Sequence, residues 1–266
     1  MPEVYEVGAV SVRALTDAVG HFFEPAVTAF PDATDAAWRS AREHDPDAFD
    51  ADGRWRLRFR CFLVTAGAST ILVDAGIGPA EAPASAWAPV PGRLPEELAA
   101  AEINPDDVDV VVLTHLHTDH VGWAVDYAAR QPYFRNARYV LQRVEYDVAP
   151  PEHQEQILAP LRAADQLQLV DGSASLAPGV RAEHAPGHTP GHQVVLVDDG
   201  GETMAITGDA FVHAIQVTDP SVLYALEADP VRAHATRLDL LSRTAVLATA
   251  HLTDPFLRVG GATGAR

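Results

Sequence analysis

A cluster of metal-binding residue types stands out in the stretch "VVVLTHLHTDHVGW", residues 110–123. Directly after a run of apolar residues, the chain places His115, His117, Asp119 and His120 close together. Neutral imidazole and carboxylate groups are ligands that suit zinc and related first-row metal ions. Because side chains alternate along extended backbone, His115 and His117 can point the same way, while the next pair reaches a second position. One loop could therefore begin two adjacent metal sites; the alternative is a hydrogen-bonded or surface histidine cluster.

Four ligands do not complete two sites, so further ligands are expected downstream. "HAPGHTPGHQ" places His188 and His192 among Gly and Pro, which is typical of a turn. "MAITGDAF" places Asp209 directly after a predicted strand, and "LATAHLTDPF" places His251 after the last one. Loops at strand ends are where α/β folds place their active sites. These four positions are therefore the candidates that would complete the metal centre.

The elements that must position these residues alternate between strands and helices. β-branched and apolar runs predict strands at 7–15, 57–66, 69–76, 107–113, 137–142, 166–170, 179–185, 192–199, 202–209 and 245–252. Helices are predicted at 94–103, at 151–165 with a break or bend near Pro160, and at 229–244, where Asp229 can cap and Pro230 can open the helix. The pattern favours a layered α/β protein with helices outside and sheet inside.

Composition narrows the possible partners. The chain has 266 residues, is 47% hydrophobic, and carries 19 Lys and Arg against 37 Asp and Glu, a formal net charge of −18. This balance argues against nucleic acid and anionic membrane, because phosphate binding needs clustered Lys and Arg. The only cysteine, Cys61, lies in a strand-like run and is expected to be an inert core thiol. Because no secretory signal and no apolar run of about 20 residues is seen, a cytoplasmic location is expected.

Two stretches stand apart from this pattern. Residues 21–56 hold several aromatic residues among charges and alanines, and residues 77–95 are rich in Ala and Pro and contain Trp87. Long irregular segments in a compact domain are usually lids, binding loops or oligomer contacts. The alternative is a packed surface arm with its aromatic side chains in a satellite core. We expect a single domain over residues 1–266, with an irregular, aromatic-containing arm at about 21–56.

The ordered motifs "THLHTDHVG", "PGHTPGH", "TGD" and a late strand-terminal His resemble the metallo-β-lactamase fold superfamily of metallohydrolases. The resemblance extends over residues 69–251, which is most of the chain. It implies an αββα sandwich, in which two packed sheets carry helices on both outer faces. The active site would lie along one edge of this sandwich.

The resemblance also implies a ligand set for two metal ions about 3.5–4 Å apart. The first ion would be held by His115, His117 and His188, the second by Asp119, His120 and His251, with Asp209 bridging them. His192 matches a histidine that is not a ligand in the family and is expected to support its turn. Asp74 is expected to accept a ligand imidazole N–H, although a plain turn Asp is the alternative. Two Zn²⁺ ions are expected, with Fe, Mn or Co as alternatives.

The same resemblance implies hydrolysis by a hydroxide that bridges the metals, with Asp119 as a proton shuttle. Asp219, Pro220 and Ser221 within "GDAFVHAIQVTDPSV" are similar to the branch of methyl-parathion-hydrolase-like enzymes and quorum-quenching lactonases. The candidate substrate-binding residues are His213, Tyr224, Phe22, Phe23, Trp38 and Trp87. For His213 the alternative is a packed core histidine, given its apolar neighbours.

The leading hypothesis is therefore a dinuclear metal-dependent hydrolase of a lactone or carboxylic ester. The alternatives are a phosphotriesterase-like or thioester hydrolase on the same metals, a mononuclear iron persulfide dioxygenase, and a non-catalytic scaffold that kept the fold. The expected partner is a small-molecule substrate, with no nucleic acid and no membrane. A homodimer stays open as an alternative to a monomer.

Overall fold

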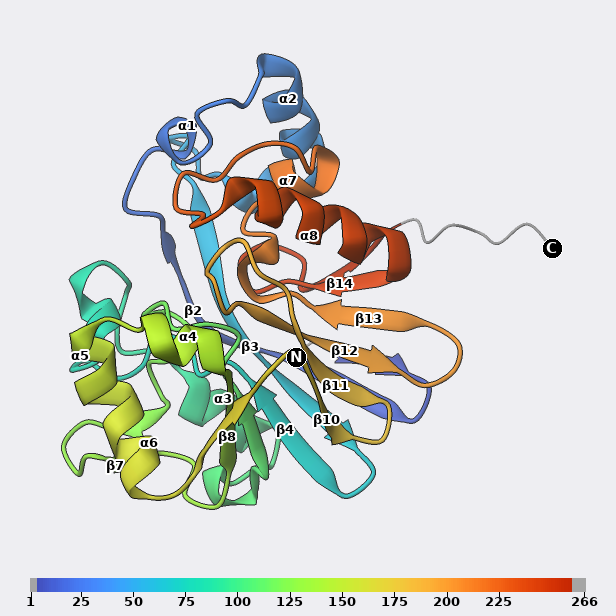
Figure 1. The fold of residues 1–266 in the computed structure, drawn as a ribbon. Coiled ribbons are helices and arrows are strands. Elements are labelled where there is room, and N and C mark those ends of the chain that lie inside the picture. Colours follow the sequence, from blue (N-terminus) through green and yellow to red (C-terminus); the bar gives the residue numbers. More distant parts are fainter. Residues whose placement is uncertain (1–3, 260–266) are drawn as a thin grey trace.

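The computed structural model describes residues 4–259, which form two β-sheets packed face to face with helices on both outer faces. The first sheet has seven strands in the order β1-β2-β3-β4-β5-β8-β9, and the second has six in the order β10-β11-β12-β13-β14-β15. Figure 1 shows α3 and α4 to α6 outside the first sheet and α8 outside the second. This is the αββα sandwich that the sequence motifs predict, and the predicted fold class is confirmed.

The first sheet changes from antiparallel to parallel pairing at β4. Its strands are β1 Val4–Val7, β2 Val10–His21, β3 Arg56–Ala66, β4 Ser69–Val73, β5 Val110–Val112, β8 Arg138–Gln142 and β9 Leu167–Val170. Pairing is antiparallel from β1 to β4 and parallel from β4 through β5 and β8 to β9. Because parallel strands run in one direction, the carboxyl ends of β4 and β5 meet at one edge of the sheet.

The second sheet contains one parallel pair, β13 with β14. Its strands are β10 Ser173–Ala177, β11 Val180–His184, β12 Gln193–Asp198, β13 Thr203–Ile206, β14 Val246–Ala248 and β15 Phe256–Arg258. A separate small ribbon is formed by β6 Val125–Asp126 and β7 Gln131–Pro132. Every predicted strand overlaps an observed one, whereas β1, β10 and β15 lie mostly or wholly outside the predicted segments.

Both faces of the central strands are apolar because both are covered. In β4, Ile71 and Val73 point into the core between the sheets, while Leu72 points to the helices outside. In β12, Val195 and Val197 likewise face the opposite sheet. Val194 and Leu196, which alternate with them, face α8. Strands buried on both faces read as continuous hydrophobic runs, as residues 110–113 do in the sequence. Cys61 is fully buried in the outer core of the first sheet, and burial raises the pKa of its thiol, as expected of an inert core residue.

The helices are short except for α8. They are α1 Ala26–Ala29, α2 Asp35–His44, α3 Leu94–Ala100, α4 Arg143–Val148, α5 Pro151–His153, α6 Ala159–Ala163, α7 Ala214–Thr218 and α8 Pro230–Arg243. Single 3₁₀ turns lie at Pro46–Ala48, Pro83–Ala86, Pro105–Asp107 and Gly208–Ala210. The side chain of Asp229 accepts the Arg232 N–H and caps α8, as the sequence indicates. Across residues 4–259, no helix combines the length and the apolar composition needed to cross a membrane.

Two sequence-based expectations need correction. Residues 21–56 are not irregular, because they contain α1, α2 and a 3₁₀ turn, and they pack through a cluster of aromatic side chains. Of the break or bend expected near Pro160 in the helical segment 151–163, the break is absent, and the irregularity beside that residue is a π-helical turn, Gln154–Leu158. Proline has no backbone N–H to donate, and a residue at the first or second position of a helix does not need one. The segment therefore accommodates Pro160 at the start of α6.

A buried ion pair fixes the loop between α7 and α8. Arg237 of α8 is fully buried and pairs with the carboxylate of Glu227. The Arg237 guanidinium also donates to the carbonyls of Pro220 (2.9 Å) and Val222 (3.3 Å), so it holds several points of the loop at once. The same loop is tied to the turn before β12, because Ala228 N–H donates to the His188 carbonyl at 3.0 Å.

Removing one partner of this pair should destabilise the protein. Arg237→Met leaves the Glu227 carboxylate buried without its cation, and we expect a loss of about 3–5 kcal/mol in urea unfolding. The double variant Arg237→Met/Glu227→Gln removes the uncompensated charge and should recover part of that loss. A loss under about 1 kcal/mol in the single variant, or a double variant no more stable than the single, would contradict this role.

Candidate metal centre

The candidate ligands all follow strands that end at one edge of the sandwich. His115, His117 and the neighbouring Asp119 and His120 lie on the loop after β5. His188 lies on the turn between β11 and β12, Asp209 in the 3₁₀ turn after β13, and His251 directly after β14. His188, Asp209 and His251 thus come from the second sheet and meet the loop of residues 115–120, which comes from the first sheet. The backbone N–H of Gln193 in β12 donates to Thr114 O at 2.9 Å and joins the two sheets beside the site.

The structure brings the predicted ligands into two groups. His115, His117, His188 and Asp209 have ligand atoms within 4.8 Å of one another, and so do Asp119, His120 and His251. The Nε2 atom of His188 lies 2.9 Å from Nδ1 of His117 and 3.3 Å from Oδ2 of Asp209. Such spacing between deprotonated nitrogen and oxygen atoms is what a shared cation would require.

Asp209 connects the two groups through its two carboxylate oxygens. Oδ2 faces the first group, 3.3 Å from His188 Nε2 and 3.9 Å from His115 Nε2. Oδ1 faces the second group, 3.1 Å from His120 Nε2 and 3.0 Å from His251 Nε2. This division of oxygens is the arrangement of a carboxylate that bridges two metal ions.

Polar contacts behind the imidazoles fix their orientation. Asp74 accepts the Thr114 N–H (2.7 Å) and hydroxyl (2.9 Å), and its Oδ2 lies 2.8 Å from Nδ1 of His120. The Thr114 hydroxyl in turn lies 3.0 Å from Nδ1 of His115. With Nδ1 of each ring engaged, Nε2 of His115 and of His120 is left facing the cluster. Asp74 itself sits in the left-handed region at φ 63°, directly after β4.

The remaining histidines of the motifs are oriented by the backbone. Nδ1 of His251 lies 2.8 Å from the Arg58 carbonyl, which leaves Nε2 facing Asp209. His192 uses both nitrogens, since Nδ1 meets the Ala185 carbonyl at 3.1 Å and Nε2 accepts the Asp209 N–H at 3.1 Å. His192 is therefore placed to support the turn rather than to bind metal. A Cβ at Gly208 would lie 2.8 Å from Nε2 of His192, so only glycine fits before Asp209.

A buried glutamate ties the two ligand loops together. Glu145 of α4 accepts the Leu116 N–H at 3.1 Å on the first loop. Its other oxygen accepts the Thr189 hydroxyl at 2.8 Å and the Gly191 N–H at 2.9 Å on the turn that carries His188. Sequence reasoning missed Glu145, because a single carboxylate outside every predicted strand and helix carries no signal of such a role.

The electrostatics of the cluster fit a cation. Nε2 of His115 is buried and has no hydrogen-bond partner within the described residues. Nε2 of His120 and Oδ1 of Asp209 are also buried, and they approach each other at 3.1 Å on the side of the cluster. Burial lowers the pKa of His115 and of His188 well below the usual range, which favours the neutral form that binds metal. Burial also opposes the charge of Asp209, yet the surrounding imidazoles hold the pKa of that carboxyl well below its usual value. The donor set therefore suits divalent metal ions.

The second group responds differently to its surroundings. Burial opposes protonation of His120 and His251, but the nearby carboxylates outweigh it and raise both pKa values. The carboxylates of Asp209 and Asp119 act on both rings. A positive charge is thus favoured at this position, and in a loaded centre a metal ion would supply it in place of protons.

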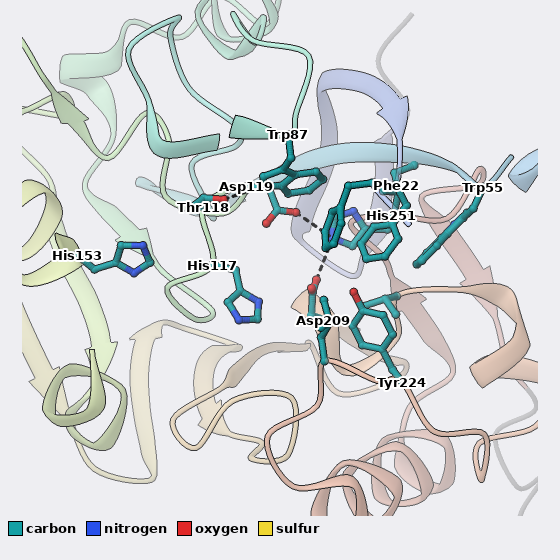
Figure 2. A pocket seen from close by; sticks show the side chains of 14 residues that line it. Phe22, Trp55, Trp87, His117, Thr118, Asp119, His153, Asp209, Tyr224 and His251 are labelled. Carbon is teal, nitrogen blue, oxygen red and sulfur yellow. Dashed lines mark hydrogen bonds and ion pairs between the residues drawn. The ribbon is translucent and has the colours of Figure 1, made fainter. Parts of the chain in front are cut away.

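A cavity of about 330 Å³ opens above the ligands. Figure 2 shows His117, Asp119, Asp209 and His251 converging on it, with aromatic rings on one side. Its apolar lining consists of Phe22, Phe23, Trp55, Leu57, Trp87, Val212 and Leu226. Thr118, Tyr224 and His153 complete the lining beside the ligands. The arrangement is that of a metal centre at the floor of a largely apolar pocket.

The predicted substrate-binding residues divide between this cavity and a neighbouring core. Phe22, Phe23, Trp87 and Tyr224 line the cavity. Trp38 does not, which corrects the expectation that it walls the pocket. His213 does not line the cavity either, so it makes no substrate contact there and is the packed core histidine that the sequence offered as the alternative. His213 is buried among Phe30, Trp38, Phe49 and Trp55, and its Nδ1 accepts the Ile215 N–H at the start of α7. The aromatic cluster that the sequence left as a satellite core thus encloses this histidine.

Several lining residues carried no signal in the sequence. Trp55 and Leu57 stand where β3 begins, Val212 follows the turn of Asp209, and His153 ends α5. Trp55 belongs to the predicted arm but was not assigned to the pocket. These residues reach the site only through tertiary packing of distant segments, so neither periodicity nor motif spacing identifies them.

Comparison with known proteins places this geometry in a family. A profile described as the metallo-beta-lactamase superfamily matches residues 60–251. An N-acyl homoserine lactonase of Bacillus sp is 32% identical over 107 residues, 40% of this chain and 39% of that protein. Metallo-beta-lactamase domain-containing protein 1 of Mus musculus is 31% identical over 183 residues, 68% of this chain and 58% of that protein. The matched regions thus cover less than two thirds of the length of these relatives.

Solved structures agree over almost the whole chain. The crystal structure of hydrolase AbOPH in the beta lactamase superfamily superposes with a TM-score of 0.80 at 26% identity, covering 99% of this chain and 94% of that one. AidC, a dizinc quorum-quenching lactonase in complex with a homoserine product, shares the fold with a TM-score of 0.78 at 24% identity, covering 99% and 95%. The family resemblance stated from the sequence motifs is confirmed.

The contacts of Asp74 predict a change in metal affinity without a change in fold. Asp74→Asn keeps the shape and tolerates the left-handed backbone, but its amide cannot accept from His120 and Thr114 together. We expect zinc affinity to fall by about 10–100-fold in competition with a chromophoric chelator. Asp109→Asn is the matched control, because that exposed carboxylate accepts only the Thr70 N–H at the surface. Equal affinity in Asp74→Asn and the wild type would overturn this role.

Burial of His213 predicts an acid-sensitive contribution to stability. Burial lowers the pKa of His213 to about 3, so between about 6.5 and 3 the unfolded chain binds a proton that the folded chain refuses. Stability should therefore fall as the pH drops through this window, by about 1.4 kcal/mol per pH unit from this group. His213→Asn can keep the cap of α7 without titrating.

Urea unfolding of the metal-free proteins at pH 7.5 and 5.0 measures this contribution. The wild type should lose roughly 2 kcal/mol more than His213→Asn between the two pH values. The other histidines titrate in both proteins and cancel in the comparison. Equal losses would show that His213 is not held neutral by its surroundings.

Proposed function

The chain belongs to the metallo-β-lactamase superfamily, and on that premise we propose that it is a dinuclear metal-dependent hydrolase of lactones or carboxylic esters. Zinc is the expected metal. The observation that carries the proposal is the placement of Asp209, whose two oxygens face two separate groups of imidazoles at the floor of the cavity. Two metals held in this way are a recurring arrangement for hydrolysis.

The second ligand group favours a dinuclear over a mononuclear centre. Asp119, His120 and His251 converge as closely as the first group does, and Asp119 keeps part of its surface open to the cavity. A mononuclear iron dioxygenase would need only the first group. The close convergence of the second group, with the buried Nε2 of His120 turned toward Asp209, therefore supports the hydrolase.

The cavity wall favours substrates with an apolar acyl or aryl part. The Phe22 ring packs in a tilted arrangement against the rings of Phe23 and Trp55, with ring centroids 4.3 and 4.6 Å apart, and Trp87 closes the same side. Burying apolar surface against such rings supplies binding free energy of about 25 cal/mol per Å². Some relatives are named N-acyl homoserine lactonase, and AidC is in complex with an N-acyl homoserine product. Compounds of this name carry an apolar acyl chain, which supports the choice of lactones as substrates.

The chain's own residues divide the work around the metals. When bound to the seven ligands, the metal ions would supply a water of lowered pKa and polarise the scissile carbonyl. Asp119 borders both the ligand group and the cavity, so it can accept a proton at a carboxylate oxygen and pass it to the leaving oxygen. The apolar wall excludes water from the acyl side.

Tyr224 is placed to donate a hydrogen bond to the substrate. Its ring stacks on His188 with centroids 5.9 Å apart and an angle of 10°, and Figure 2 shows its hydroxyl turned toward Asp209. Burial, together with the nearby carboxylates, raises the pKa of Tyr224, so the phenol stays protonated. A protonated phenol beside the metals can donate to a carbonyl oxygen as negative charge develops on it.

A substrate panel tests the proposal directly. The zinc-loaded protein is assayed with an acyl-homoserine lactone, an aryl ester, an acyl thioester and paraoxon, and kcat/KM is compared. We expect the lactone or the ester to give the highest value. A higher value for paraoxon or the thioester would move the assignment to those bonds, and one iron per chain with oxygen consumption would replace it by a dioxygenase.

Tyr224→Phe tests the proposed hydrogen bond. It should lower kcat on the best substrate by at least about tenfold, with a smaller effect on KM, because the bond strengthens as charge develops. Tyr133→Phe is the matched control, since Tyr133 lies outside the cavity. Equal kcat values in Tyr224→Phe and the wild type would remove Tyr224 from the mechanism.

A further inference from the structure

A second cavity shares part of the aromatic wall of the catalytic cavity. It has a volume of about 610 Å³ and lies where the segment that leads into α1, the helix α2 and the turn before β3 meet. Phe22, Phe23 and Trp55 line both cavities. The described lining of the second cavity contains none of the seven candidate metal ligands, so hydrolysis at the metal centre gives it no role. We call it the arginine groove, because Arg42 and Arg54 belong to its lining.

Backbone pairing fixes the apolar side of the arginine groove. Phe49 and Trp55 pair across an isolated antiparallel bridge, and the Phe22 N–H donates to the Trp55 carbonyl at 3.1 Å. Trp38 of α2 packs against the Phe49 ring, with ring centroids 6.0 Å apart. The aromatic lining is thus contributed by segments that are joined to one another, and it does not depend on a single loop.

Two arginines of the groove have no carboxylate partner. Within residues 4–259, neither the Arg42 nor the Arg54 guanidinium forms an ion pair. Asp50, in the same turn as Arg54, is engaged by the His21 ring at 2.8 Å and by two backbone N–H groups. Glu24 is the one acidic residue of the described lining, and it is exposed and pairs with neither arginine. Two arginines against one glutamate leave the lining positive, although the formal net charge of the chain is −18.

Arg42 is oriented by an aromatic ring. Its guanidinium carbon lies 3.9 Å from the centroid of the Phe49 ring, so one face of the cation covers that ring. The guanidinium makes no hydrogen bond within the described residues, and its N–H groups stay available at the edge of the group. Two parallel N–H groups of an arginine match both oxygens of a carboxylate. A guanidinium that is already oriented loses less entropy when it binds such a group.

The groove combines two properties that one class of molecule satisfies together. Its rings offer apolar surface to an aryl or alkyl body, and its arginines offer forked donors to a carboxylate. A neutral alcohol would gain only the apolar contacts, and a small inorganic anion would gain only the charge. The volume of about 610 Å³ lies within the range of about 300–1,000 Å³ that is usual for ligand cavities.

We propose that the arginine groove is a second binding site, which takes a small apolar carboxylate. The carboxylate lies against Arg42 and Arg54, and the apolar body lies against the rings of Trp38, Phe49 and Trp55. The inference goes beyond the proposed function, because no metal ligand and no reacting atom takes part in this site.

Calorimetric titration with 4-phenylbutyrate at pH 7.5 tests this site in the zinc-loaded protein. Saturating acetohydroxamate occupies the zinc ions, so that the carboxylate of the probe does not bind them. We expect saturable binding with a dissociation constant of about 1 mM or below. Arg42→Gln/Arg54→Gln should weaken this binding by about tenfold, because charge-assisted hydrogen bonds are lost. Arg42→Lys/Arg54→Lys, which keeps the charges but not the forked donors, should recover part of the loss.

Two comparisons show whether the groove itself binds the probe. Arg39→Gln/Arg56→Gln removes the same charge from exposed residues outside the lining, and it should bind 4-phenylbutyrate as the wild type does. 4-Phenylbutanol has the same apolar body without the carboxylate, and it should bind equally weakly to the wild type and to Arg42→Gln/Arg54→Gln. Circular dichroism of each variant identifies any loss that comes from misfolding.

Four results of the titration would overturn the inference. They are the absence of saturable binding, equal affinity in the wild type and Arg42→Gln/Arg54→Gln, an equal loss in Arg39→Gln/Arg56→Gln, and no recovery in the lysine variant. Sedimentation of the same proteins gives a further check. A dimer that dissociates in Arg42→Gln/Arg54→Gln would assign the arginines to an interface between two copies of the chain, and would also overturn the inference.

The titration separates this inference from the proposed function, because it measures binding alone. If the protein hydrolyses no lactone or ester, the proposed function fails and the comparison between the variants still stands. If the protein holds no zinc, the metal-free wild type and variants give the same comparison.

Discussion

The carboxylate of Asp209 is the constraint on which the rest of the structure depends. It is 6% exposed and lies within 3.9 Å of four imidazole nitrogens, two on each side. Burying a carboxylate costs several kcal/mol unless opposite charge and hydrogen bonds compensate it. Protons on the imidazoles could supply that charge only in part, because burial keeps His115 and His188 neutral. The donor set around Asp209 therefore suits divalent cations, which would supply the remaining positive charge.

The fold keeps these groups from turning away from one another. Asp74 holds His120, the Thr114 hydroxyl holds His115, and the Arg58 carbonyl holds His251. Glu145 then links the loop after β5 to the turn before β12, and these two segments come from different sheets. The site therefore forms only when the sandwich closes, and metal binding should stabilise the closed sandwich in return. The polar contacts behind the ligands matter as much as the ligands themselves.

The sequence predicts those features that are encoded locally. The residues 115–120 stand together in the chain, and the strand before them is marked by an unbroken apolar run, so both loop and strand could be located. The pairing of that loop with His188, Asp209 and His251 came from the family resemblance, and the structure brings these residues together. Glu145, which links two ligand loops, and His153, which lines the cavity, were missed because each reaches the site across a long sequence separation with no motif. Within 21–56, α1 is too short to show a period, whereas α2 does carry one, with Ala37 and Ala41 buried four residues apart and Thr34 as its cap, and the sequence-based prediction overlooked it because the buried residues are small alanines among charges.

The aromatic residues show the same limit. Phe22, Trp38 and Trp87 were grouped from composition alone, but packing divides them between the cavity and the cluster around His213. Composition indicates that aromatic side chains will be buried, and only the tertiary arrangement decides which of them face a substrate.

Anomalous X-ray scattering at the zinc edge, from crystals of the zinc-loaded protein, tests the central claim most directly. The account predicts two peaks, one on each side of the Asp209 carboxylate, beside His188 and beside His251. A single peak, or peaks away from Asp209, would contradict it.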